Sequence, residues 1–176
     1  DGTFRDEAML RGAAYSGDGR PQASMGIALG DVSQDGAPDL LLTHLGGESN
    51  TLYQSAGTLG FLDDSVRSGL SAPGFLLTGF GVCWADLDLD GDLDTAVANG
   101  SIRRRDKRTD RLVRPVDSPS LTPFAADYGE RNQLFVNLGD GQFQEVSSQS
   151  VSYSADAQVS RGLACGDLNN DGRPDL

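Results

Sequence analysis

Small and large residues alternate in three short segments of the chain, at positions 26–30, 81–85 and 162–166. The first, third and fifth positions of each segment are small, and most residues between them are large. Because successive side chains of a strand point to opposite faces, each segment predicts a strand with one small face and one bulky face. A small face permits close approach of a neighbouring backbone, and a bulky face suits a core. The bulky positions are Ile27 and Leu29, Val82 and Trp84, and Leu163 and Cys165.

An Asp-rich segment of the form D-x-(D/N/S)-x-D-G-x-x-D follows each of these strands, beginning at Asp31, Asp86 and Asp167. Another apolar run comes next, for example at 40–42 and 93–98, and two further short strands follow. A Gly-rich turn at 139–141 joins the last two strands of one unit. The earlier unit has Thr58 and Leu59 in place of Asp and Gly, so we expect a less regular turn there.

The spacing of these features indicates true repetition. The first two Asp-rich segments begin 55 residues apart, and the next begins 81 residues further on. An insertion at 101–130 accounts for the difference of 26, and the markers Phe4, Phe61 and Phe143 show the same jump, with gaps of 57 and 82. Four short strands per unit of this length, with no sustained helical period, predict an all-β fold, namely a fragment of a β-propeller with four-stranded blades.

The predicted organisation of residues 1–176 is a partial propeller from a longer protein. Residues 1–24 end a preceding blade, 25–78 and 79–159 each form a blade, and 160–176 begin the next blade. The Asp-rich loops lie between the first and second strands of each blade. We expect such a fragment to fold poorly by itself, because its open strand edges can pair with other chains.

The Asp-rich loops have the composition of calcium sites, since calcium is a hard cation that takes six to eight oxygen ligands. Carboxylates at alternate positions of a tight loop can converge on one point, and Gly at position 6 permits a sharp turn. The backbone oxygen at position 7 and Asp at position 9 complete the shell, whereas the Asp92 side chain is expected to face solvent. The second loop, with the most carboxylates, is expected to bind most tightly. The predicted ligands are Asp31, Ser33, Asp35, Ala37, Asp39, Asp86, Asp88, Asp90, Asp92, Asp94, Asp167, Asn169, Asp171, Arg173 and Asp175.

Two other kinds of loop have a similar composition. The first is a set of Asx turns that cap their own backbone; three copies at equivalent places, each dense in acids, favour a metal instead. The second is an EF-hand, which needs an acid at position 12. Leu42 and Val97 occupy that position, and the flanking segments resemble strands, so an EF-hand is rejected.

The chain is acidic, with a formal net charge of -12, which disfavours nucleic acid and anionic membranes as partners. No apolar run is long enough to span a membrane. The single histidine, His44, is interpreted as a surface or edge residue. Cys83 and Cys165 are interpreted as small buried residues, and their places on opposite strand faces argue against a mutual disulfide. Trp84 is assigned to the core.

Half of the Lys and Arg residues lie in the insertion. One interpretation is a solvated loop, and the other is a contact site for an acidic partner. Because loops alternate between the ends of a propeller, the insertion is expected to project from the end opposite the Asp-rich loops. The cationic residues are Arg103, Arg104, Arg105, Lys107, Arg108, Arg111 and Arg114.

The sequence resembles the FG-GAP/VCBS repeats of integrin α-subunit propellers and many secreted bacterial proteins. It is most similar to the cartilage acidic protein-like (ASPIC/UnbV) family in three runs: 79–82, 96–100 and 131–143. The resemblance implies a seven-bladed propeller with calcium in the loop between strands one and two. It also implies export from the cytoplasm, with an extracellular, cell-surface or periplasmic location, and a role in adhesion or ligand binding.

The sequence therefore predicts a non-enzymatic, calcium-binding module for extracellular protein or acidic glycan. The alternative is the propeller domain of a calcium-dependent polysaccharide lyase. A lyase needs a base and charge-neutralising groups on one face of the central channel, and the sequence offers no such cluster beyond the Asp-rich loops and the insertion.

Overall fold

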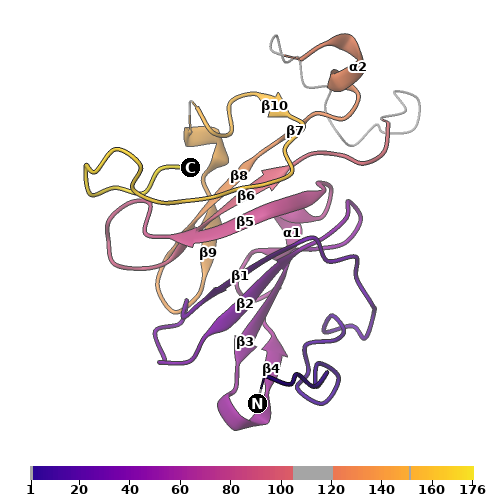
Figure 1. Ribbon diagram of the computed structural model, residues 1–176, viewed down its shortest axis with the longest axis vertical. Helices are drawn as coiled ribbons and strands as arrows, with labels where there is room; N and C mark the ends of the chain where they lie inside the picture. Colours follow the sequence, from indigo (N-terminus) through magenta and orange to yellow (C-terminus); the bar gives the residue numbers. More distant parts are fainter. Residues whose placement is uncertain (1, 105–120, 151) are drawn as a thin grey trace.

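The computed structural model describes residues 2–104, 121–150 and 152–176, and they form antiparallel sheets with only short helical turns. Two four-stranded sheets dominate, each a meander in which neighbours in sequence pair directly, apart from the inserted β7 (Figure 1). The first sheet contains β1 (Gly26–Gly30), β2 (Asp39–Thr43), β3 (Thr51–Ser55) and β4 (Phe61–Asp63). The second contains β5 (Gly79–Ala85), β6 (Asp94–Asn99), β8 (Gln133–Asn137) and β9 (Phe143–Glu145). Each repeat thus forms one sheet, as the sequence predicted.

The inner strands β2 and β3 carry the buried residues of the first sheet, and burial alternates along β2. Leu41 of β2 and Leu52 of β3 are directly opposite each other, and both are fully buried. In the second sheet β6 is buried along its whole length. This strand lies between β5 and β8, and because its side chains alternate between the two faces, both faces of the sheet are covered along it.

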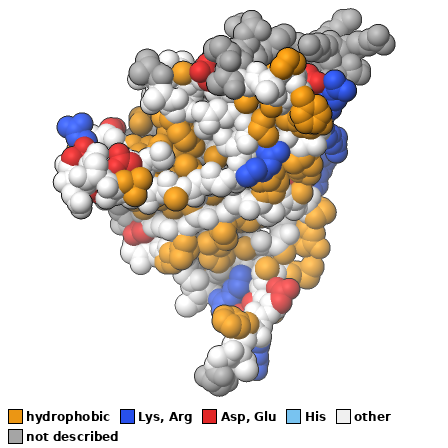
Figure 2. Space-filling view, turned by 45° about the horizontal axis from the view of Figure 1, so that its top comes forward, with side chains coloured by type: hydrophobic (Ala, Val, Ile, Leu, Met, Phe, Trp, Pro, Cys, Tyr) orange, Lys and Arg blue, Asp and Glu red, His pale blue; other side chains and the backbone are white. Residues whose placement is uncertain are grey.

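The two sheets pack through their first strands, β1 and β5. A Cβ added to Gly26 would lie 1.8 Å from the Phe80 carbonyl oxygen, so the small face of β1 lies directly against β5. Trp84 of β5 stacks on Phe143 at 5.6 Å between ring centroids and packs against the buried core, which confirms its core assignment. Figure 2 shows apolar side chains across the middle of one face, with acidic side chains on the loops at its left.

The last strand of each sheet, β4 or β9, also bonds to the linker that precedes its own repeat. The Phe61 amide donates to the Arg11 carbonyl at 2.7 Å, and the Phe143 amide donates to the Ser68 carbonyl at 2.7 Å. Gly12 follows Arg11, and Gly69 follows Ser68. A Cβ added to Gly12 or Gly69 would lie within 2.6 Å of the carbonyl oxygen of Phe61 or Phe143, respectively. The two linkers are therefore structurally equivalent, which the sequence comparison did not recognise.

The turn between the last two strands differs between the repeats, as expected. In the second sheet Gly139, Asp140 and Gly141 all have positive φ and close a tight turn. In the first sheet the short 3-10 helix η1 (Gly57–Leu59) takes its place. A second such helix, η2 (Ser147–Gln149), follows β9.

The insertion departs from β6 and returns at β8, between the second and third strands as predicted. Its described part includes α2 (Pro123–Ala126) and β7 (Glu130–Arg131), which pairs with β10 (Ala157–Gln158). Another short helix, α1 (Ser71–Gly74), lies in the connection between the sheets. In Figure 1 α2 lies on the side away from the Asp-rich loops, which agrees with the expected placement. Five of the seven cationic residues fall at 105–114, outside the described residues.

Residues 160–176 begin a third copy of the pattern. Gly166 and Asp175 form an antiparallel bridge, equivalent to the pairs Gly30–Asp39 and Ala85–Asp94 in the two sheets. The exact blade boundaries and the closed ring of blades stay predictions. No described helix is long and apolar enough to cross a membrane.

Candidate metal centre

Each Asp-rich loop is closed by its first aspartate. In the second loop, the two carboxylate oxygens of Asp86 accept hydrogen bonds from the backbone amides of Asp90 at 3.0 Å and Gly91 at 3.1 Å. The amides at positions 5 and 6 of the other loops make the same bonds at 2.9–3.1 Å, to Asp31 and to Asp167. The same two hydrogen bonds therefore give all three Asp-rich loops the same shape.

Backbone conformation supports this shape at two positions. Gly36, Gly91 and Gly172 at position 6 have φ between 83° and 96°, which glycine adopts without steric cost. Position 4 is also left-handed although it is never glycine, with φ between 57° and 66° at Gln34, Leu89 and Asn170. The sequence analysis missed this second position, because only Asn170 is a residue type that favours such a conformation.

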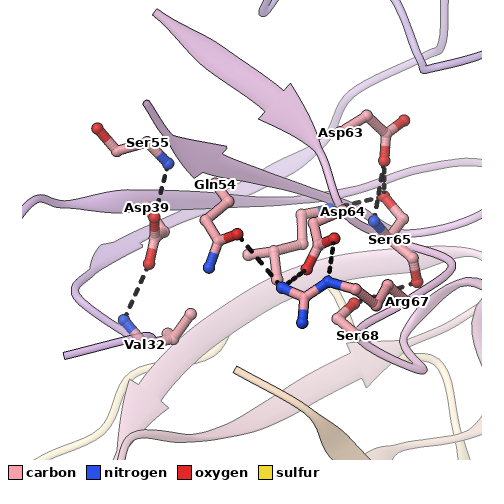
Figure 3. A network of polar contacts seen from close by, with 10 residues as sticks. Val32, Asp39, Gln54, Ser55, Asp63, Asp64, Ser65, Arg67 and Ser68 are labelled. Atoms are coloured by element: carbon pink, nitrogen blue, oxygen red, sulfur yellow. Dashed lines mark hydrogen bonds and ion pairs between the residues drawn. The ribbon is translucent and has the colours of Figure 1, made fainter. Parts of the chain in front are cut away.

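The last aspartate of each loop is bonded to the backbone around it. Asp39 accepts from the amides of Val32 at 3.1 Å and Ser55 at 2.8 Å (Figure 3). Asp94 accepts equivalent bonds, at 2.8 Å each, from Leu87 and from Asn137. Both carboxylates thus join their loop to the third strand of the sheet.

Burial affects these two carboxylates strongly. Asp39 and Asp94 have no exposed surface, and desolvation raises the pKa of each above its ordinary value, although the backbone donors oppose this. A buried anion is costly without a cationic partner. A bound cation would offset the cost of burying these two carboxylates.

The second loop brings three carboxylates together. Asp86, Asp88 and Asp94 each offer one oxygen, and these oxygens lie within 4.8 Å of one another. Such an all-oxygen set suits a hard cation like calcium. The carboxylate of Asp90 instead accepts from the Asp92 amide at 2.9 Å, and the Asp92 carboxylate accepts from the Gln34 side chain. The Asp92 side chain therefore contacts the neighbouring loop as well as solvent, rather than solvent alone.

The first and third loops do not form such a three-acid group within the described parts of the chain. The first has another feature that suits a cation: the Ser33 hydroxyl oxygen, at ligand position 3, is buried and has no hydrogen-bond partner. In the third loop, Asn169 bonds both the amide and the carboxylate of Asp171, at 2.8 Å and 3.1 Å. Ala37 and Arg173 lie at position 7 of their loops, and Asp175 lies at position 9 of the third loop. The Asp175 carboxylate accepts from the Leu168 amide at 2.9 Å.

Two assignments outside the loops were wrong. His44 is buried, with only 1% of its surface exposed, and its carbonyl accepts from the Gly79 amide at the start of β5. Cys165 is exposed rather than buried, whereas Cys83 is half-buried. Both cysteines are free thiols.

These features define an antiparallel all-β repeat protein with Asp-rich turns between the first and second strands of each sheet. The FG-GAP-like repeat family matches residues 106–176. Cartilage acidic protein 1 of Mus musculus is 28% identical over 153 residues, which cover 79% of this chain and 23% of that protein. The match of residues 106–176 to the FG-GAP-like repeat family agrees with the resemblance seen in the sequence. The chain spans less than a quarter of the length of this relative.

Proposed function

We propose that the Asp-rich loops bind calcium and that the ion stabilises the stacked sheets. The convergence of Asp86, Asp88 and Asp94 carries this proposal. The backbone carbonyl of Asp92 and the carboxylate of Asp90 would complete the ligand set. Calcium would supply positive charge that neutralises the crowded carboxylates, two of which already hold backbone amides of the loop and of β8.

A matched pair of variants tests calcium binding in the complete protein. Asp88→Asn removes one converging carboxylate that, among the described residues, holds no backbone amide. Asp92→Asn removes an equal charge in the same loop but keeps the backbone carbonyl and an oxygen that can accept from Gln34. Calorimetric titration should show about tenfold weaker calcium binding for Asp88→Asn, or about 1.4 kcal/mol, and little change for Asp92→Asn. Equal effects, or no calcium binding by the unaltered protein, would overturn the proposal.

We further propose that the sheets are blades of a propeller. The stacking of β1 on β5 supports this, since the bulky residues of β5 pack on the preceding strand. The equivalent residues of β1, Ile27 and Leu29, are about two-thirds exposed at 64% and 65%. Another blade stacked in the same way would cover them. Imaging the complete protein by electron microscopy tests this, because an open stack without a central channel would contradict it.

The proposed role is binding outside the cytoplasm without catalysis. The match to cartilage acidic protein 1 and the calcium-type loops both support export. Weak calcium sites, with dissociation constants of about 0.1–1 mM, are typical of extracellular modules. A structural role is favoured because the loop carboxylates bond mainly to their own backbone. Incubation with uronic-acid polysaccharides tests the alternative of a calcium-dependent lyase, since calcium-dependent release of unsaturated sugars would favour the enzyme.

An acidic glycan or acidic protein surface is the partner chemistry we propose for the insertion. Its described cations, Arg103 and Arg104, line a surface depression with Ser101 and Ile102. Arg104 also bonds Asp127 at 2.7 Å, although 71% of its side chain is exposed, so it is tethered yet accessible. Exposed pairs of this kind contribute only about 0–1 kcal/mol and can be exchanged for a partner. Changing both arginines to serine should lower the salt needed for elution from a sulfated-glycan column, and unchanged elution would remove this site.

A further inference from the structure

The segment at 160–166 lies along β5 and runs in the same direction as that strand. The Arg161 guanidinium lies over the Phe80 ring, 4.3 Å from its centroid. Further along, a Cβ added to Gly81 would lie 2.4 Å from the Leu163 amide nitrogen, so the two backbones are in close contact. This segment therefore packs on β5 as β5 packs on β1.

The interface between β1 and β5 shows which faces meet. A Cβ added to Gly30 would lie 2.9 Å from the Trp84 ring, so the bulky face of one strand packs on the small face of the strand before it. In the repeat alignment Cys165 occupies the position of Trp84, and Cys83 occupies that of Ala28. Opposite faces of successive repeats are the ones that meet, so lying on opposite strand faces does not by itself keep the two cysteines apart.

The contacts of the two thiols agree with this geometry. The Cys165 sulfur lies 3.6 Å from the Trp84 carbonyl oxygen, beside the residue that follows Cys83. Burial, together with the neighbouring Cys165 thiol, raises the pKa of Cys83 to about 12. Cys165 is exposed to solvent and Cys83 is half-buried behind it.

We propose that Cys83 and Cys165 form a disulfide bond that joins two successive repeats in an oxidising environment. The oxidant is a small-molecule disulfide. The exposed Cys165 thiolate attacks one of its sulfurs, forms a mixed disulfide and releases one small thiolate. Cys83, as its thiolate, then attacks the Cys165 sulfur and displaces the second small thiolate. Two electrons pass from the protein to the oxidant, and the two cysteine protons end on the two released thiols.

The bond would hold the third copy of the repeat against β5 independently of the Asp-rich loops. Its formation needs only the two thiols and an oxidant, whereas its presence in the native protein also rests on the proposed export. Extracellular compartments keep such bonds, and cytosolic ones reduce them.

The test is oxidation of the folded complete protein with oxidised glutathione, with and without a calcium chelator, followed by alkylation and peptide mass spectrometry without reduction. We expect a linked pair of peptides containing Cys83 and Cys165, lighter by two hydrogens than the separate peptides, and a higher melting temperature. The link should form with the chelator present, which separates this result from a failure of calcium binding. Recovery of both cysteines with the alkyl label would overturn the proposal.

Two variants control for scrambled pairing. Cys83→Ala installs the residue that the first repeat carries at the equivalent position, Ala28, and Cys165→Ser removes the partner. Neither should gain the rise in melting temperature on oxidation, and in Cys83→Ala the remaining Cys165 should be recovered as a glutathione adduct. A rise in either single variant equal to that of the unaltered protein would attribute the stabilisation to another bond and would contradict the proposal.

Discussion

The side-chain amide of Asn137 donates a hydrogen bond to the backbone carbonyl of Val32 at 3.0 Å, although the two residues lie 105 positions apart. Val32 belongs to the first Asp-rich loop, and Asn137 ends β8 in the second sheet. The same amide group also donates to the carbonyl of Leu93 at 3.3 Å. One buried side chain thus binds the loops of two successive repeats, which would couple the stability of neighbouring sites.

Changing Asn137→Asp should destabilise the pair of sheets. The change keeps the shape of the side chain but replaces its donors with a carboxylate, so two buried carbonyl groups lose their partner. Leaving buried polar groups unsatisfied costs about 1–3 kcal/mol. Gln144→Glu adds the same charge at an exposed position of β9 and should change the free energy of unfolding by less than about 0.5 kcal/mol. Denaturant unfolding of both variants measures the difference, and similar midpoints would show that the Asn137 contacts contribute little.

Gly26→Ala should loosen the packing of β1 on β5. Its new Cβ would meet the Phe80 carbonyl oxygen at 1.8 Å, and both atoms belong to strands that cannot separate without moving the core. Overpacking of this kind costs about 1–3 kcal/mol. Gly46→Ala is the control, because its Cβ would make contacts of 3.4 Å or more and the backbone there needs no left-handed conformation. A melting temperature equal to that of the control would contradict the close approach of the two strands.

His44 should make stability fall as the pH is lowered. Desolvation by burial lowers its pKa, although Glu48, the Ala23 backbone and Asp63 oppose this effect. Below the ordinary value of about 6.5, the unfolded chain takes up a proton that the folded protein resists. The free energy of unfolding therefore decreases as pH falls, by at most about 1.4 kcal/mol per pH unit for one such group. In a calcium chelator, His44→Gln should show a shallower slope than the unaltered protein between about pH 7.5 and 5.5, and equal slopes would contradict this.

The strands and their pairing could largely be predicted, because alternation and repeat spacing are local properties of the sequence. Leu41 lies at a buried position of β2, whose burial alternates, and it pairs with the buried Leu52 of the next strand in sequence. The linker contacts of Gly12 and Gly69 with the edge strands could not be predicted. They depend on how one repeat leans on the next, which no local period encodes.

The candidate site was predictable in its members but not in its geometry. The motif identified Asp86, Asp88 and Asp94 from their spacing, but not that one oxygen of each would lie within 4.8 Å of the others. The role of Asp90 as a further ligand stays a prediction. Asn137 was missed because its role arises from a contact with another repeat. His44 was misassigned because burial of a polar residue at a strand end depends on tertiary packing, which the local pattern does not show.

The first loop should become a stronger calcium site when Ser33 is changed to aspartate. Ser33 occupies ligand position 3, and its buried hydroxyl oxygen has no hydrogen-bond partner. Aspartate there reproduces the acids at positions 1, 3, 5 and 9 of the second loop. Added ligand charge tightens calcium binding, and we expect about tenfold, or about 1.4 kcal/mol. Without calcium, the extra carboxylate beside Asp31 and Asp35 should lower the melting temperature, since like charges repel.

Ala37→Asp provides the matched control for this change. Position 37 is equivalent to Asp92, whose side chain lies outside the converging group while its backbone carbonyl is the predicted ligand. The variant therefore adds the same charge to the same loop without adding a ligand atom. Calcium titration by calorimetry should show clearly tighter binding for Ser33→Asp than for Ala37→Asp. Equal gains would mean that general negative charge attracts the ion, and they would refute the assignment of position 3 as a ligand, because a ligand position must differ from a neighbouring position of equal charge.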